Sequence, residues 1–190
     1  MKVGVLALQG AFRAHADKLI ELGGDVVEVR RPPHLDEVDA LIMPGGESTT
    51  MSMLLESSGL FDPLAIRIDD GMPVFGTCAG LILLSSNIED GRPDQRSFGR
   101  FDIDVQRNGY GRQIESFETE LDTTVTSEPI HAVFIRAPRI VRHGDGVDVL
   151  AESRGDAVLV RSGSALGASF HPELATDTRI HRLFLDSVAS

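Results

Sequence analysis

The sequence predicts an α/β domain in which a mixed, mostly parallel sheet is flanked by helices. In the first half of the chain, short apolar runs are separated by helical patterns, which is typical of βαβ units. After residue 100 the pattern changes to short strands, which makes the predicted sheet mixed. The 190 residues lie within the usual range of about 100–200 for one domain. No long linker or internal repeat divides the chain, so we expect a single domain over residues 1–190.

In the first half, predicted strands and helices end close to turn signals such as Pro-Gly-Gly after residue 43 and Gly-Gly after residue 22. The short apolar runs predict strands, and the stretches of 3.6-residue periodicity predict helices. We expect strands at 3–8, 26–29, 40–43 and 73–77, and helices at 11–22, 48–57, 61–70 and 79–85.

The second half begins with a polar stretch at 87–100 that contains glycine, proline and several charges, and we expect a surface excursion there. Short runs of strand-forming residues follow, and a helical pattern closes the chain. We expect strands at 102–107, 114–120, 131–135, 147–152, 157–161 and 165–170, and a helix from about 178 to the C-terminus.

Composition excludes several classes of function. With 18 basic and 29 acidic residues the formal charge is −11, which argues against non-specific binding to nucleic acid or to an anionic membrane. The single cysteine excludes an internal disulfide framework and a multi-cysteine metal site. We expect neither a metal nor a cofactor. The opening apolar run is too short for a bilayer span and lacks the layout of a signal peptide, which favours a cytoplasmic protein.

That one cysteine, Cys78, stands in the motif Gly76-Thr77-Cys78-Ala79-Gly80, between a predicted strand and a predicted helix. This is the layout of a nucleophile elbow, in which small neighbours let strand and helix pack closely. The helix N-terminus behind the thiol provides free N–H groups that favour a thiolate and can bind an oxyanion. A lone cysteine is more often a buried structural residue, but the flanking glycines and the strand–turn–helix context favour a nucleophile.

A second motif, Phe170-His171-Pro172-Glu173, follows the last predicted strand. Residues two apart in extended backbone point the same way, so His171 and Glu173 can face one side. A cysteine nucleophile needs a base, and the base needs an acceptor that fixes its tautomer, which these two residues supply. A surface histidine beside a solvated carboxylate is the alternative. The other five histidines are weaker candidates, among them His15 in the first predicted helix and His181 in the last.

The third motif, Pro44-Gly45-Gly46-Glu47-Ser48-Thr49-Thr50, also joins a strand to a helix. Its glycines let backbone N–H groups face a ligand, and Ser48 or Thr49 can cap the helix. The carboxylate of Glu47 could pair with a ligand's ammonium group. No Gly-Lys-Ser/Thr follows, so this is not a phosphate-binding loop. Together, the three motifs at three strand ends indicate acyl transfer by a thiolate, and the residues alone leave the substrate open.

These motifs resemble those of the class I (triad) glutamine amidotransferases. Within that class, the sequence is similar to the glutaminase subunits of pyridoxal 5′-phosphate synthase, and the similarity covers essentially the whole chain. Besides the three motifs, it rests on Leu8-Gln9-Gly10, Arg107-Asn108-Gly109-Tyr110-Gly111-Arg112-Gln113, Ser116-Phe117-Glu118 and Phe134-Ile135-Arg136-Ala137-Pro138. The resemblance implies the flavodoxin-like fold of class I glutaminases.

The resemblance also implies a role for each motif. Cys78 would attack the side-chain amide of glutamine, with His171 as base and Glu173 as its orienting partner. Backbone N–H groups near Gly46 and Ala79 would hold the oxyanion. Glutamine would be bound by Gly46, Glu47, Ser48, Arg107, Ile135 and Arg136. The two guanidinium groups suit an α-carboxylate, and the carboxylate of Glu47 suits an ammonium group. An ordinary surface role is the alternative for both arginines.

In this family ammonia passes to a partner, the synthase subunit of pyridoxal 5′-phosphate synthase, and the resemblance implies such a hetero-oligomer here. Gln9 and Gly10 would lie on the face that meets this partner, although the residues alone indicate only a strand-to-helix turn. Two other functions remain open: a stand-alone cysteine hydrolase or peptidase of related fold, and a non-catalytic regulatory module. The intact set of Cys78, His171 and Glu173 argues against the regulatory module.

Overall fold

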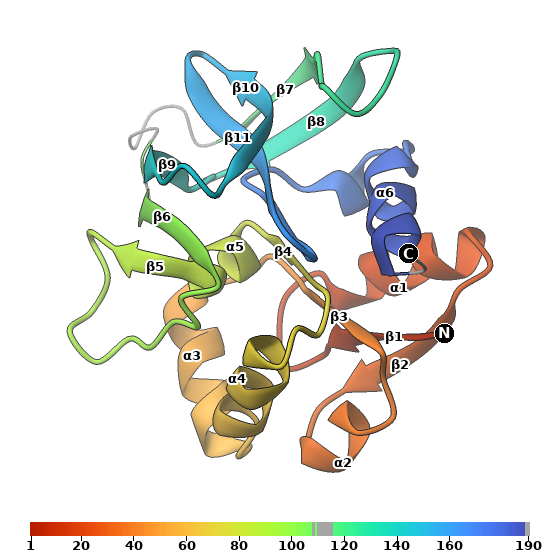
Figure 1. Ribbon diagram of the computed structural model, residues 1–190, viewed down its shortest axis with the longest axis vertical. Helices are drawn as coiled ribbons and strands as arrows, with labels where there is room; N and C mark the ends of the chain where they lie inside the picture. The colour runs from red at the N-terminus through yellow and green to blue at the C-terminus, as the bar shows by residue number, and fades with distance from the viewer. Residues whose placement is uncertain (108, 110–115, 189–190) are drawn as a thin grey trace.

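The protein is built on a seven-stranded sheet with helices on both faces (Figure 1). The computed structural model describes residues 1–107, 109 and 116–188. Across the sheet the strands follow the order β10 (Asp148–Ser153), β11 (Asp156–Ser162), β12 (Ala165–Ala168), β4 (Val74–Thr77), β3 (Ala40–Met43), β1 (Lys2–Leu6) and β2 (Asp25–Val29).

Five of these strands, from β2 to β12, run parallel, and β11 and β10 continue the sheet with antiparallel pairing. The parallel part has the order β2-β1-β3-β4-β12, which is the flavodoxin-like order of a doubly wound sheet. Ligands of such sheets bind at the carboxyl ends of the strands. The prediction of a mixed, mostly parallel sheet is therefore confirmed, and its topology indicates where a site should lie.

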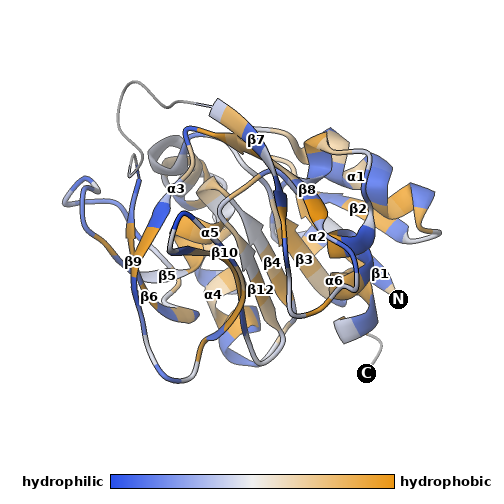
Figure 2. Ribbon diagram, turned by 90° about the horizontal axis from the view of Figure 1, so that it is seen from above, coloured by the Kyte–Doolittle hydropathy of each residue, from blue (hydrophilic) through white to orange (hydrophobic). Residues whose placement is uncertain are grey.

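The helices divide between the two faces of the sheet. α1 (Phe12–Glu21) and α6 (Arg179–Val188) pack side by side on one face, and α3 (Ser48–Ser57), α4 (Phe61–Asp69) and α5 (Ala79–Leu84) lie on the other (Figure 1). Each face has its own apolar core: Leu19 and Phe184 belong to one, Met51 and Leu64 to the other. Surface helices such as α1 carry both hydrophilic and hydrophobic residues (Figure 2), as expected for a helix with one buried side.

Two smaller sheets pack on the central one, and each contributes side chains to the apolar core of one face. One joins β5 (Ser85–Ile88), β6 (Phe101–Gln106) and β9 (Arg139–His143), and the other is the antiparallel pair β7 (Ser116–Leu121) and β8 (Ile130–Ile135). Short helical turns, α2 (Pro32–Leu35) and η1 (Pro172–Leu174), complete the described elements. In the described part of the chain, no helix is long and apolar enough to cross a membrane.

The structure corrects the expected elements at several places. The strand β9 and the turn α2 were not expected, and residues 87–88 belong to β5 rather than to a surface excursion. The rest of that stretch folds back onto the protein, because Phe98 stacks on Phe61 with 4.5 Å between ring centroids. Residues 114–115 of one expected strand and 189–190 of the last helix lie outside the described residues.

Candidate active site

The backbone around Cys78 forms a strained strand-to-helix turn between β4 and α5. Cys78 has φ 48° and ψ −103°, a left-handed conformation that is unusual for a residue with a side chain. A Cβ atom added to Gly76 would lie 2.6 Å from the carbonyl carbon of Gly80, and one added to Gly80 would collide with the carbonyl oxygen of Met43. The two glycines are therefore required for the close approach of strand and helix that places the thiol at this turn.

His171 and Glu173 are placed by the chain that follows β12. The backbone N–H of His171 donates to the carbonyl oxygen of Val133 in β8 at 2.8 Å, which fixes the start of η1. His171 Nδ1 lies 2.7 Å from Glu173 Oε1, and both side chains are buried. Because a carboxylate only accepts, Nδ1 of His171 carries the proton and Nε2 faces the other way.

The surroundings of this pair favour its charged forms. Burial disfavours the charge on His171, but hydrogen bonds and charges from Cys78 and Glu173 outweigh it and raise the pKa of His171 to about 10. Burial would likewise raise the pKa of Glu173, but the interactions with His15 and the hydrogen bond from His171 outweigh it and lower that pKa. At neutral pH the site therefore holds an imidazolium beside a carboxylate.

Glu47 has a structural role that the sequence did not indicate. Its Oε1 accepts from the N–H of Thr49 at 3.2 Å, and its Oε2 accepts from the N–H of Thr50 at 2.7 Å, so Glu47 is the N-cap of α3. The expectation that Ser48 or Thr49 caps this helix is wrong. Arg107 donates to Glu47 Oε1 at 2.8 Å, and burial, which would raise the pKa of Glu47, is outweighed by these hydrogen bonds, which lower it.

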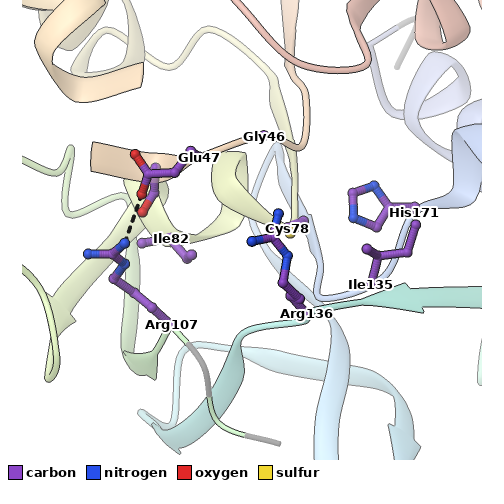
Figure 3. A pocket seen from close by; sticks show the side chains of 9 residues that line it. Gly46, Glu47, Cys78, Ile82, Arg107, Ile135, Arg136 and His171 are labelled. Carbon is purple, nitrogen blue, oxygen red and sulfur yellow. Dashed lines mark hydrogen bonds and ion pairs between the residues drawn. The ribbon is translucent and has the colours of Figure 1, made fainter. Parts of the chain in front are cut away.

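Most of the predicted site residues line one cavity of about 170 Å³ at the carboxyl ends of the central strands; the predicted residues outside its lining are Glu173, Ala79, Gln9 and Gly10. Figure 3 shows Cys78 between the Glu47–Arg107 pair on one side and His171 with Ile135 on the other. The cavity is smaller than the roughly 300–1,000 Å³ of sites for drug-sized ligands, which suits a small metabolite. It is lined by Gly46, Glu47, Ser48, Cys78, Ile82, Arg107, Ile135, Arg136 and His171.

Gln9 and Gly10 do not line the cavity; they contact the Gly45–Glu47 turn that forms part of the site. The side-chain amide of Gln9 donates to the carbonyl oxygen of Glu47 at 2.7 Å. Gly10 has φ 82°, and a Cβ atom there would collide with the carbonyl oxygen of Gly45. Gln9 therefore holds the Gly45–Glu47 turn by a hydrogen bond, and the absence of a side chain at Gly10 lets the backbone pack directly against that turn. Among the motif residues that follow Arg107, Asn108 and 110–113 lie outside the described residues.

Several residues around the site were missed at the level of sequence. Ile82 lies one helical turn after Cys78 on α5, so the i, i+4 spacing could have indicated it. His15 and His181 were the weaker histidine candidates, yet both are fully buried, and His15 Nε2 lies 3.3 Å from Glu173 Oε2. No sequence signal connects them, because 166 residues separate the two histidines.

Comparison with known proteins agrees with this geometry. A model of the SNO glutamine amidotransferase family matches residues 5–190. The chain belongs to this family. The resemblance to glutamine amidotransferases is therefore confirmed.

Curated relatives of this amidotransferase share about half of its residues. A pyridoxal 5′-phosphate synthase subunit PdxT from Mycobacteroides abscessus is 54% identical over 186 residues, which is 98% of this chain and 96% of the relative. A protein of the same name from a Nocardioides species is 52% identical over 191 residues, covering 98% of this chain and 95% of the relative.

Solved structures agree with the fold of this family member. A crystal structure of a glutamine amidotransferase is 47% identical, covers 99% of both chains and superposes with a TM-score of 0.92. A putative GMP synthase subunit from Thermoplasma acidophilum, 20% identical with a TM-score of 0.70, shares the fold over 100% of this chain and 94% of that one. The fold class predicted from the sequence is confirmed, while the roles of individual residues remain predictions.

Proposed function

We propose that the chain hydrolyses L-glutamine to L-glutamate and ammonia as the glutaminase subunit of a pyridoxal 5′-phosphate synthase. The observation that carries this proposal is the single cavity in which Cys78 and His171 lie together with the predicted glutamine-binding residues. The name and the near-complete coverage of the PdxT relatives support the same function.

The proposed chemistry is acyl transfer through a thioester. The sulfur of Cys78 attacks the amide carbon of glutamine, and His171 holds the proton that the thiol gives up. The carbonyl oxygen becomes an oxyanion beside the N–H groups of Gly46 and Ala79; the latter is the first residue of α5, where N–H groups have no intrahelical partner. His171 then protonates the leaving nitrogen, ammonia departs, and water hydrolyses the glutamyl thioester.

The raised pKa of His171 supports its role as the acid of this sequence. A group with a pKa of about 10 holds its proton at neutral pH and can give it to the leaving nitrogen. Glu173 fixes the ring with its 2.7 Å contact to Nδ1, so that Nε2 is the atom that faces the thiol. Glu173 orients the base in the way that the third member of a triad does.

Recognition of glutamine would depend on the charged side chains that line the cavity. Arg107 and Arg136 supply guanidinium groups for the α-carboxylate, and Glu47 supplies a carboxylate for the ammonium group. In the structure Arg107 and Glu47 bind each other, so each of them is held in place before the substrate arrives. Gly46, Ser48 and Ile135 complete the lining.

We further propose that the ammonia is delivered to a synthase subunit that makes pyridoxal 5′-phosphate. Gln9 and Gly10, which follow β1, would lie on the face that meets this partner. Because both residues also support the Gly45–Glu47 turn, docking at this face would act directly on the proposed oxyanion site.

The test is ammonia release from glutamine by wild type and by Cys78→Ala, each with and without the partner synthase. We expect activity from the wild type with its partner and none from Cys78→Ala, because no other cysteine can replace the nucleophile. A glutamine-analogue electrophile should label Cys78 at the same time. Activity retained by Cys78→Ala, or a wild type that stays inactive with its partner, would overturn the proposal.

A further inference from the structure

A chain of buried polar side chains continues behind Glu173, away from the cavity. Glu173 Oε1 is bound to His171, and among the described residues no hydrogen bond reaches its other oxygen, Oε2. His15 Nε2 lies 3.3 Å from Oε2 and 3.1 Å from Thr77 Oγ1. On its other side, His15 Nδ1 lies 2.9 Å from His181 Nε2. Both histidines have no exposed surface.

The contacts of His15 decide where its proton lies. Nε2 faces a carboxylate oxygen, which can only accept, so a proton on Nε2 is attractive and a lone pair there is repulsive. Burial lowers the pKa of His15 to about 4, despite the opposing charge of Glu173, so the ring is neutral at pH 7 and carries one proton. With that proton on Nε2, Nδ1 is an acceptor, and it accepts from the Nε2–H of His181.

The opposite arrangement is less favourable. If His15 carried its proton on Nδ1, its Nε2 lone pair could accept from the hydroxyl of Thr77 but would face the Glu173 carboxylate at 3.3 Å, and His181 would have to accept with Nε2 and hold its proton on Nδ1. His181 Nδ1 is buried and makes no hydrogen bond within the described ranges, so that proton would be an orphaned donor. With the His15 proton on Nε2 instead, His181 Nδ1 is an acceptor, and its lone pair is the only group left without a partner at that atom.

We propose that His15 is a positioning residue of the glutaminase site: its Nε2–H, which contacts Thr77 Oγ1, lies 3.3 Å from Oε2 and attracts the Glu173 carboxylate from behind, and His181 holds His15 in that tautomer. This inference rests on the proposed function. Two contacts on opposite oxygens, His171 at Oε1 and His15 at Oε2, fix the rotation of the Glu173 carboxylate. With Oε1 held toward His171, the imidazole keeps its orientation toward Cys78 throughout the reaction. α1 and α6 thereby take part in the site without reaching the cavity.

The first test reads the tautomers directly in the full-length wild type. Long-range ¹H–¹⁵N correlation spectra distinguish Nδ1–H from Nε2–H imidazoles, and the chain has 6 histidines to assign. We expect His15 and His181 to be neutral Nε2–H tautomers at pH 7. A charged His15, or an Nδ1–H tautomer of His15, would overturn the proposal, and this measurement needs neither substrate nor partner.

The second test compares His15→Gln, which keeps an N–H donor, with His15→Leu, which removes it. With the partner synthase present, His15→Leu should lose at least about 10-fold in kcat, as outer partners of ligands do at metal sites, with KM unchanged because His15 does not line the cavity. The pKa of His171 should fall, because a loosened Glu173 stabilises the His171 cation less. His15→Gln should recover most of both losses.

Control measurements distinguish a positioning role of His15 from a role in packing, and they distinguish a failure of this proposal from a failure of the proposed function. His143→Leu, at an exposed histidine of β9, should match the wild type. If His15→Gln is as impaired as His15→Leu, or if His15→Leu keeps the wild-type kcat and His171 pKa, His15 is not a positioning residue. If His15→Leu does not fold, His15→Gln and the wild-type spectra still decide. A wild type that hydrolyses no glutamine contradicts the proposed function instead, and the tautomers remain measurable.

Discussion

Gly45 lies directly against the His171 ring at the end of β3. A Cβ atom added to Gly45 would collide with Cε1 of His171, would lie 2.9 Å from its Nδ1, and would lie 3.4 Å from Cβ of Cys78. Nδ1 is the atom that Glu173 holds, so the ring has little freedom to move away without losing that contact. The absence of a side chain at Gly45 is therefore part of the geometry that brings the thiol and the imidazole together.

Gly45→Ala should displace the His171 ring and lower kcat strongly. A misplacement of about 1 Å can cost about 100-fold in rate, so a loss of that size is expected in ammonia release with the partner present. Gly146→Ala is the matched control, since a Cβ atom there meets nothing within 4 Å. Equal rates for the two variants would show that the His171 ring adapts, and would contradict its tight packing against Gly45.

Single residues also show how far the sequence can predict this site. The elbow motif and the His171-Pro172-Glu173 motif indicated the nucleophile and its base because each is a local pattern with a chemical reason. His15 had no such pattern, because its contact with Glu173 depends on how α1 packs against the segment after β12. Long-range contacts of this kind are decided by packing, and periodicity along the chain does not contain them.

At the scale of elements, helix α3 links the proposed substrate site to the stability of the fold. Its N-cap, Glu47, satisfies two of the N–H groups that a helix start leaves free, and it also pairs with Arg107 in the cavity. One carboxylate therefore has a structural task and a proposed binding task. The two tasks need different chemistry, since a cap needs only an acceptor and the pairing needs a charge.

Comparing Glu47→Ser with Glu47→Ala separates these tasks. Serine is a good N-cap, so Glu47→Ser should keep the free energy of unfolding near that of the wild type, while Glu47→Ala should lose about 1 kcal/mol. Both variants remove the charge, so both should raise KM for glutamine. Denaturant unfolding and steady-state kinetics measure the two effects. A normal KM in both variants would remove Glu47 from substrate binding, and equal stability would show that the cap contributes little.

The elements that the sequence did not predict are those that depend on distant partners. β9 contains Arg139 and Arg142, whose charges obscure a strand pattern, and it is stabilised where Arg142 binds Asp102 at 2.6 Å and Asp104 at 2.8 Å. β5 follows α5 directly, with no turn signal between them. By contrast, the central strands are continuous apolar runs buried on both faces, which the sequence alone identifies.

At the scale of the whole molecule, stability depends on pH because two buried histidines have lowered pKa values and a third has a raised pKa. Burial lowers the pKa of His15 to about 4 and that of His181 to about 3, below the unfolded value of 6.5. Between those values the unfolded chain binds more protons than the folded one, so stability falls on acidification. His171 has a raised pKa, so its contribution is complete below pH 6.5 and is lost as the pH rises towards 10.

The free energy of unfolding should therefore fall between pH 6.5 and 4, before the carboxylates with lowered pKa values are protonated. At about 1.4 kcal/mol per pKa unit, His15 alone should account for roughly 3 kcal/mol of this loss. Denaturant unfolding of wild type and His15→Gln across this range measures the effect. The variant should show a distinctly shallower slope, because the glutamine does not titrate. Parallel slopes would mean that His15 takes up its proton without unfolding, in which case the buried pair is more accessible to water than its packing between α1 and α6 implies.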